Sequence, residues 1–262
     1  MRIVLIGDGI LDNFQHLNNP EHDLTYSLRK QRLEVENYAS ENTKLFDIHK
    51  GIKISKTAQR KRSYGYRTSS DGKMHPLQYL GHNFEMAYSS SSSSVADNKT
   101  VVLSVGGNDI NSHKLRLALG IKTFFNTLLT RSFREEYRKV IELIKEKNSR
   151  LILITIYLPY LGEGSSYATY QNYSEQLISG WNGFLCEMAK NYNIPVLDLS
   201  RTIDPQKREH YCAEDMTHMS DYTSHIVAKC IAHIHNHHDF DADGYRCYYA
   251  PDGNVEMIKH DA

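Results

Sequence analysis

Short apolar runs alternate with amphipathic stretches along most of the chain. Five runs predict buried strands, because they are rich in β-branched and aliphatic residues and are bounded by glycine, proline or polar residues. These strands cover residues 2–6, 34–39, 100–105, 151–158 and 195–199. Apolar residues at helical spacing predict four helices, over residues 24–33, 133–147, 174–192 and 220–236.

This alternation predicts a parallel sheet. Strands that alternate with helices at such spacing form crossover connections between parallel strands. Ligands of open parallel sheets bind beyond the carboxyl ends of the strands. We therefore expect the chemistry in the loops that follow residues 6, 39, 105 and 199.

Two parts of the chain do not follow the alternation. Residues 53–99 are polar and weakly periodic, and they contain a basic cluster and a run of six serines. We expect a solvated insertion there, with a lid or a partner-binding loop as the alternative. The single domain is predicted to span residues 1–238, and residues 239–262 are expected to form a C-terminal tail.

Composition excludes several classes of protein. The chain of 262 residues has 31 basic and 31 acidic side chains, and 40% of all its residues are hydrophobic. A disordered chain would have fewer apolar residues or a large net charge, and a nucleic-acid binder usually has a basic excess. No run approaches the ~20 apolar residues of a membrane span. The first apolar run is also too short for a signal peptide, so we expect a cytoplasmic protein or a mature form without its leader.

Cysteine and histidine patterns do not predict a metal centre. Cys186, Cys212, Cys230 and Cys247 are widely scattered and are expected to be free thiols. The histidine-rich segment 233–243 would be a metal candidate if the helix continued through it. We favour a solvated helix end, where cations are stabilised by the helix dipole.

Unusual residues gather in the loops where chemistry is expected. The first strand is followed by GDGILDN at 7–13 and the second by NYASENT at 37–43. The third strand leads into SVGGND at 104–109, and EDMTHMS at 214–220 precedes the last helix.

This ordered set of motifs resembles the SGNH (GDSL) hydrolases. That family opens on Gly-Asp-Ser-x-x-x-Asp, continues with Gly-x-Asn-Asp, and ends on Asp-x-x-His before a helix. The resemblance runs from residue 2 to about residue 235. It implies a flavodoxin-like three-layer α/β/α sandwich with a five-stranded parallel sheet. The implied activity is acyl transfer to serine and hydrolysis of a small or lipid-like ester, without a metal or organic cofactor.

The resemblance also implies roles for individual residues. His218 matches the general base, and Asp215 matches the carboxylate that fixes the imidazole tautomer. Asn108 matches the side-chain donor of the oxyanion hole, and Asn42 occupies the position of a glycine whose backbone N–H is another donor. The positions expected to structure the motifs are Asp8, Asp12 and Gly107.

The chain departs from the family at the nucleophile, where Gly9 replaces serine. Glycine keeps a backbone N–H for the oxyanion hole but has no hydroxyl, so no acyl-enzyme forms there. Three explanations stay open. The serine was replaced to inactivate the enzyme, or the chain is a natural pseudoenzyme that binds a ligand or partner, or His218 activates a water in the vacated space.

A rival interpretation is a dinucleotide-binding protein. The string GDGILD partly matches the fingerprint G-x-G-x-x-G after a strand. Asp12 stands where the third glycine belongs, and its charge would repel a pyrophosphate at the helix N-terminus. We therefore expect an ester as the partner of this site, with no nucleic acid and no integral membrane segment. The sequence leaves the oligomeric state open.

Overall fold

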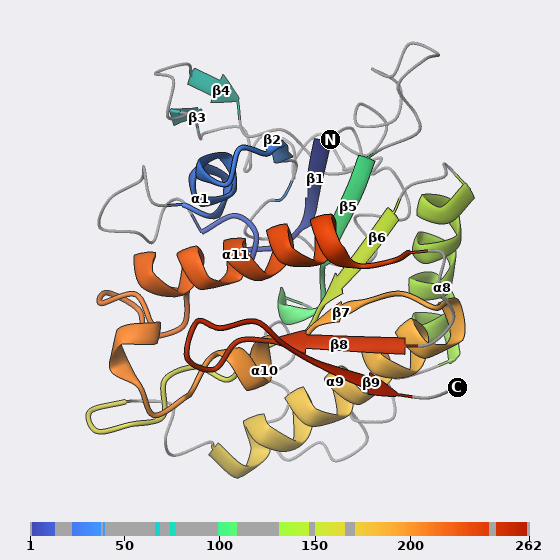
Figure 1. Ribbon diagram of the computed structural model, residues 1–262. Coiled ribbons are helices and arrows are strands. Elements are labelled where there is room, and N and C mark those ends of the chain that lie inside the picture. The colour runs from blue at the N-terminus through green and yellow to red at the C-terminus, as the bar shows by residue number, and fades with distance from the viewer. Residues whose placement is uncertain are drawn as a thin grey trace.

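A sheet of seven strands forms the centre of the protein (Figure 1). The computed structural model describes residues 2–13, 23–37, 39, 66–68, 74–76, 99–108, 131–146, 150–165, 171–240 and 245–260. The strands of the sheet are β1 (Arg2–Gly7), β2 (Glu34–Asn37), β5 (Lys99–Ser104), β6 (Arg150–Ile154), β7 (Val196–Leu197), β8 (Tyr245–Tyr249) and β9 (Glu256–His260).

The first five of these strands confirm the predicted parallel sheet. They lie in the order β2-β1-β5-β6-β7, and each neighbouring pair is parallel. Numbered among themselves, they follow the 2-1-3-4-5 order of flavodoxin-like folds. Strands β1 and β5 are buried along almost their whole length, which explains why their sequences are apolar without alternation.

The C-terminal segment corrects the expected number of strands. The sequence predicted five strands and a tail, but residues 245–260 add a hairpin to the same sheet. Strand β8 pairs parallel to β7, and β9 pairs antiparallel to β8. Without the hairpin, β7 would be an edge strand with unpaired backbone N–H and C=O groups. The hairpin pairs with this edge and buries Tyr245, Cys247 and Tyr248.

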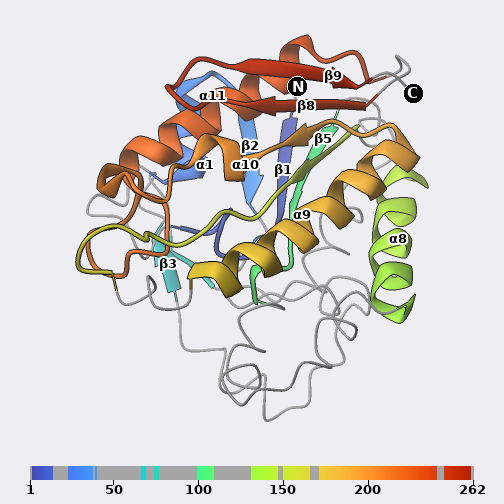
Figure 2. The same cartoon turned by 90° about the horizontal axis from the view of Figure 1, so that it is seen from below.

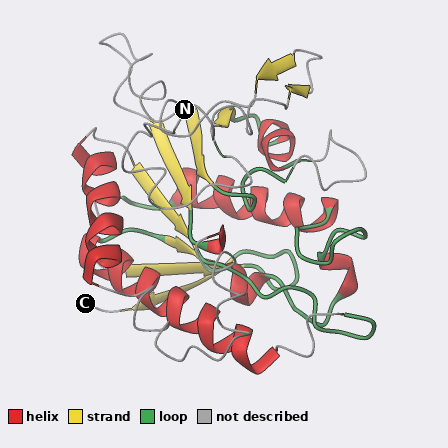
Figure 3. Cartoon of the chain, turned by 180° about the vertical axis from the view of Figure 1, so that it is seen from behind, coloured by secondary structure: helices red, strands yellow, loops and turns green. Residues whose placement is uncertain are grey.

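All four predicted helices are present, on both faces of the sheet. They are α1 (Leu24–Lys30), α8 (Arg131–Glu146), α9 (Gln171–Tyr192) and α11 (Asp221–His237). Helices α1 and α11 pack together over one face, whereas α8 and α9 cover the other (Figures 1, 2 and 3). Two short helical segments, α10 (Leu199–Thr202) and the 3-10 turn Arg208–His210, lie between β7 and α11.

Within the segment expected to be an insertion, the structure describes one small antiparallel pair. Strand β3 (Tyr66–Thr68) pairs with β4 (Met74–Pro76). The six serines lie outside the described residues, as do Arg60, Lys61 and Arg62 of the basic cluster. The fourth member of the cluster, Arg67, lies in β3.

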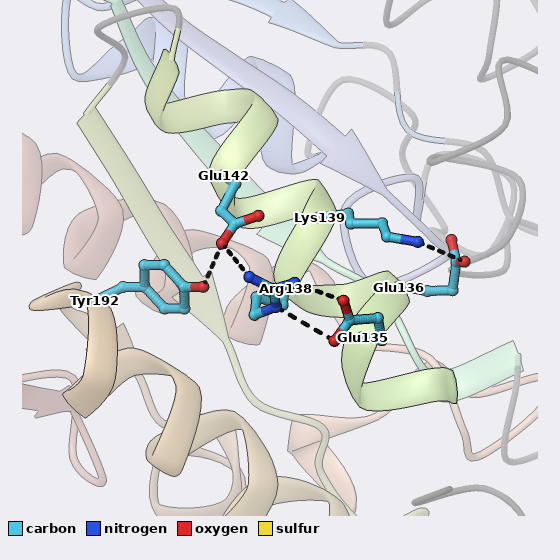
Figure 4. Close-up of polar contacts among 6 residues, drawn as sticks. All are labelled: Glu135, Glu136, Arg138, Lys139, Glu142 and Tyr192. Atoms are coloured by element: carbon cyan, nitrogen blue, oxygen red, sulfur yellow. Dashed lines mark hydrogen bonds and ion pairs between the residues drawn. The ribbon is translucent and has the colours of Figure 1, made fainter. Parts of the chain in front are cut away.

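Helices α8 and α9 contact each other through aromatic rings in the core and through polar side chains on the solvent side. Tyr137 makes edge-to-face contacts with Trp181 and Phe184, at ring-centroid distances of 6.4 and 5.4 Å. On the solvent side, Arg134 of α8 pairs with Glu187 of α9 at 3.0 Å. The Tyr192 hydroxyl of α9 donates to Glu142 of α8 at 2.9 Å (Figure 4). Exposed pairs of this kind contribute little, so the aromatic contacts dominate this interface.

Candidate active site

The loop after β1 is organised around a buried carboxylate. Asp8 is only 2% exposed. Its Oδ1 accepts hydrogen bonds from the Ser104 hydroxyl at 3.1 Å and from the Ile10 N–H at 3.2 Å. Its Oδ2 accepts from the Gly107 N–H at 3.3 Å. A buried charge requires such donors, so Asp8 joins the loop that contains Gly9 to the loop that contains Asn108.

Gly9 lies in a tight, buried turn directly after Asp8. The N–H groups of Leu11 and Asp12 both donate to the Asp8 carbonyl, at 3.0 and 3.1 Å. In the described ranges, glycines with positive φ are Gly7, Gly106, Gly164 and Gly253. Gly9 is not one of them, so its backbone conformation is open to any residue.

The Asp-x-x-His motif closes on itself. Asp215 Oδ1 accepts hydrogen bonds from the N–H groups of Thr217 at 2.9 Å and His218 at 3.0 Å. Its other oxygen bonds to His218 Nδ1. The three-residue spacing thus lets one aspartate fold the loop and also hold the imidazole. A proton kept on Nδ1 leaves Nε2 as the basic nitrogen.

A buried tyrosine holds this loop against the sheet. The Tyr157 hydroxyl donates to the Thr217 carbonyl at 2.9 Å, and the Tyr160 N–H donates to the Met216 carbonyl at 2.9 Å. Burial raises the pKa of Tyr157 well above its usual value, and the charges of Tyr211, Asp215 and Asp8 add to this rise. The carboxylates of Asp8 and Asp215, which belong to two different loops, therefore both interact electrostatically with the Tyr157 phenol.

Sequence reasoning missed these supporting residues. Tyr157 and Tyr160 lie in the loop after β6, because this strand ends at Ile154 and not at residue 158 as the sequence predicted. This loop was not among those in which chemistry was expected. Arg208 was missed as well. Its guanidinium donates to the carbonyls of Cys212 at 3.0 Å and Ala213 at 2.8 Å, just before Asp215.

Of the remaining predicted site residues, the structure describes Asn108, Asp12 and Gly107 but not Asn42. Asn108 is half-buried and directly follows Gly107, and Asp12 is buried in the first loop. A Cβ on Gly107 would lie 3.2 Å from Asp8 Oδ2, which explains why a glycine suits that position. Asn42 lies outside the described residues, so its expected role stays a prediction.

The candidates set aside in the sequence are also placed. All four cysteines are free, and three of them are buried. Helix α11 ends at His237, and Asp241 lies outside the described residues. Within the described ranges, no group of three or more His, Cys, Asp or Glu side chains could hold a metal ion. No helix in the part of the chain that the structure describes is long and apolar enough to cross a membrane.

The parallel sheet and the His–Asp pair at its carboxyl edge define an SGNH-type hydrolase fold. The family of GDSL-like lipases and acylhydrolases matches residues 3–231, and the chain belongs to this family. Membership places the chain in an ester-hydrolase class of proteins. The match ends before β8, so the C-terminal hairpin lies beyond the matched region.

Solved structures support the fold at low sequence identity. The lipase Lip_vut3 from a goat rumen metagenome is 13% identical, with a TM-score of 0.59 over 87% of this chain and 94% of that chain. A member of the lipolytic G-D-S-L family from Veillonella parvula is 13% identical, with a TM-score of 0.55 over 89% and 96%. The acetyl xylan esterase AlAXEase is 17% identical, with a TM-score of 0.51 over 87% and 96%. No curated protein matches the chain.

Proposed function

We propose that the chain carries the acyl-transfer site of a GDSL ester hydrolase whose nucleophile position is occupied by Gly9. The observation that carries this proposal is the bond between His218 Nδ1 and Asp215, which leaves the imidazole in the tautomer of a general base. A site kept only for packing has no need of this arrangement.

Each remaining residue has a role in the proposed site. The Gly9 N–H and the Asn108 side chain would stabilise the oxyanion, with the Asn42 N–H as a third donor. His218 would take the proton of a nucleophile at position 9, and Asp215 would stabilise the imidazolium. The substrate would be a small or lipid-like ester, and the reaction requires no metal or organic cofactor.

Without a hydroxyl at position 9, this chain cannot form an acyl-enzyme. Ester binding and oxyanion stabilisation remain, and such remnants give only slow turnover. The present form is therefore proposed to be an inactivated variant that still recognises esters. A natural binding protein with the same pocket is the alternative.

The Gly9→Ser variant tests the proposal. We expect it to react covalently with a fluorophosphonate and to hydrolyse short p-nitrophenyl esters at least about 10⁴-fold faster than the Gly9 chain. Serine is tolerated by the backbone, because Gly9 does not have a positive φ. Mass spectrometry after labelling would locate the adduct on residue 9.

Two controls make the result decisive. Adding His218→Ala to Gly9→Ser should abolish labelling, since the base is lost while the hydroxyl remains. Circular dichroism would establish that each variant is folded. A folded Gly9→Ser protein that neither labels nor turns over ester would contradict the proposed site and favour the binding protein.

A further inference from the structure

A buried hydrogen bond joins the loop after β1 to helix α11. Asn13 Nδ2 donates to the Ser224 Oγ at 2.6 Å, across 211 positions of sequence. Asn13 is 1% exposed and Ser224 is fully buried. The bond therefore connects the loop of Gly9 to the helix that begins directly after the His218 loop.

The other hydrogen bonds of Ser224 and Asn13 fix which of the two side chains donates. The Ser224 hydroxyl donates to the Ser220 carbonyl at 2.8 Å, so it must accept from Asn13. Asn13 in turn accepts from the Leu24 N–H at 3.3 Å. Ser220 is the N-cap of α11 and lies two residues after His218. Because each buried group has its partner, removing one member leaves another unsatisfied.

A second amide holds the same loop from the other side. Asn37, at the end of β2, donates to the Leu11 carbonyl at 3.1 Å and to Thr25 Oγ1 at 2.9 Å. Asp8 already anchors the beginning of the loop. The end of the loop is thus pinned against α1 and α11, and its position relative to α11 depends on the bond between Asn13 and Ser224.

We propose that Asn13 and Ser224 are positioning residues that set the distance between position 9 and His218. The inference rests on the proposed function, since it concerns the alignment of a nucleophile with its base. Neither side chain needs to touch substrate. A misplacement of about 1 Å in such an alignment can cost about 100-fold in rate, so one buried bond at this junction has a measurable effect.

The first test uses the Gly9 chain as it exists and needs no activity. Ser224→Ala should speed amide exchange at Leu11 and Asp12 about tenfold, because a buried hydrogen bond no longer restrains the loop. Exchange at Val102 in β5 serves as the reference for global opening. Ser27→Ala is the matched control, since Ser27 is a buried serine on the neighbouring helix α1.

A hydroxyl restored at position 224 should slow amide exchange in the loop again. Ser224→Thr keeps an Oγ at the same position and is expected to return Leu11 and Asp12 exchange close to that of the parent. The positioning role is overturned if Ser224→Ala changes their exchange, relative to Val102, no more than Ser27→Ala does.

The second test measures alignment in the Gly9→Ser background. Ser224→Ala should lower kcat about 10- to 100-fold and leave KM unchanged, and Ser224→Thr should recover the rate. Because a smaller folded fraction would also lower the apparent kcat without changing KM, kcat is calculated per active site titrated with the fluorophosphonate. Equal kcat values for Ser224→Ala and Ser27→Ala would contradict the inference. If Gly9→Ser itself is inert, the proposed function fails, while the exchange experiment still decides whether the two residues hold the loop.

Discussion

The glycines beside the candidate site, Gly7, Gly9 and Gly106, are subject to different physical constraints. Gly7 has φ +154°, and a Cβ there would lie 1.9 Å from the Ser104 carbonyl oxygen. Gly106 has φ +126°, and a Cβ there would lie 2.0 Å from Trp181 Cζ2. These two positions require glycine for packing and conformation. Gly9 is not among the described glycines with positive φ, so in the sequence GDG only Gly7 is required by its backbone conformation.

Gly106→Ala tests the close approach of Trp181. We expect a loss of about 3 kcal/mol in the free energy of unfolding, because the methyl group overpacks the site and strains the backbone. Urea denaturation followed by tryptophan fluorescence measures it directly. Gly183→Ala is the matched control on α9, where no atom lies within 4 Å of the added Cβ, and it should gain about 0.5–1 kcal/mol. Equal stabilities of the two variants would contradict the packing argument.

Helix α11 makes specific hydrogen bonds at both of its ends. At its start, the Ser220 Oγ accepts from the Thr223 N–H at 3.3 Å, which is the N-cap expected from the sequence. Near its end, His235 Nδ1 bonds to Thr100 Oγ1 at 2.8 Å inside the sheet face. At the C-cap, His238 Nδ1 bonds to the Tyr248 hydroxyl at 2.9 Å. The last turn is therefore part of the packed interior as well as a polar helix end.

His238 makes the stability of the chain depend on pH. Burial, with a smaller effect of Arg246, lowers the pKa of His238 to about 4 from its usual 6.5. Between these values the unfolded chain binds a proton that the folded chain does not, so stability falls as pH falls through this window. The slope from this residue approaches about 1.4 kcal/mol per pH unit.

His238→Gln should flatten this dependence. Urea denaturation at pH 7 and pH 5 should give a smaller difference in unfolding free energy for the variant than for the parent. Glutamine has no titration in this range, and it can still bond to the Tyr248 hydroxyl. Identical pH differences in the two proteins would show that His238 is not buried in its neutral form.

At the scale of the whole molecule, the C-terminal hairpin completes the sheet. The Asp198 N–H donates to the Tyr248 carbonyl at 2.8 Å, and the Ala250 N–H donates to Thr202 Oγ1 at 3.1 Å. Asp198 also caps α10, which lies at the carboxyl end of β7. The hairpin thus supports the strand that leads toward the His218 loop, although it lies beyond the region matched by the family.

Truncation after residue 238 tests this support. The buried side chains of Tyr245, Cys247 and Tyr248 would be removed, and burial of each tyrosine contributes about 1.5–3 kcal/mol. The total is comparable to the stability of a typical domain, so the truncated chain should lose its cooperative thermal transition by circular dichroism. A chain lacking only residues 261–262 is the control. An unchanged transition in the truncated chain would show that residues 1–238 fold independently of the hairpin.

Much of the architecture was predictable because its signals are local. Strands β1, β5 and β6 are continuous apolar runs, and α11 combines an N-cap serine with a helical apolar stripe. Parallel order follows from the alternation of strands and helices. The hairpin was not predictable in the same way, because the short sequence YRCYY becomes buried only where the edge of β7 is open to it.

The sequence by itself determined the fold class, the order of the motifs, the pairing of Asp215 with His218 and the absence of a hydroxyl at position 9. These features depend on residue type and on spacing within a few positions. Only the tertiary structure decided that Asp8 joins two loops, that Tyr157 holds the His218 loop, and that Asn13 meets Ser224. Such contacts form between segments far apart in the chain, and no local pattern encodes which buried donor meets which acceptor.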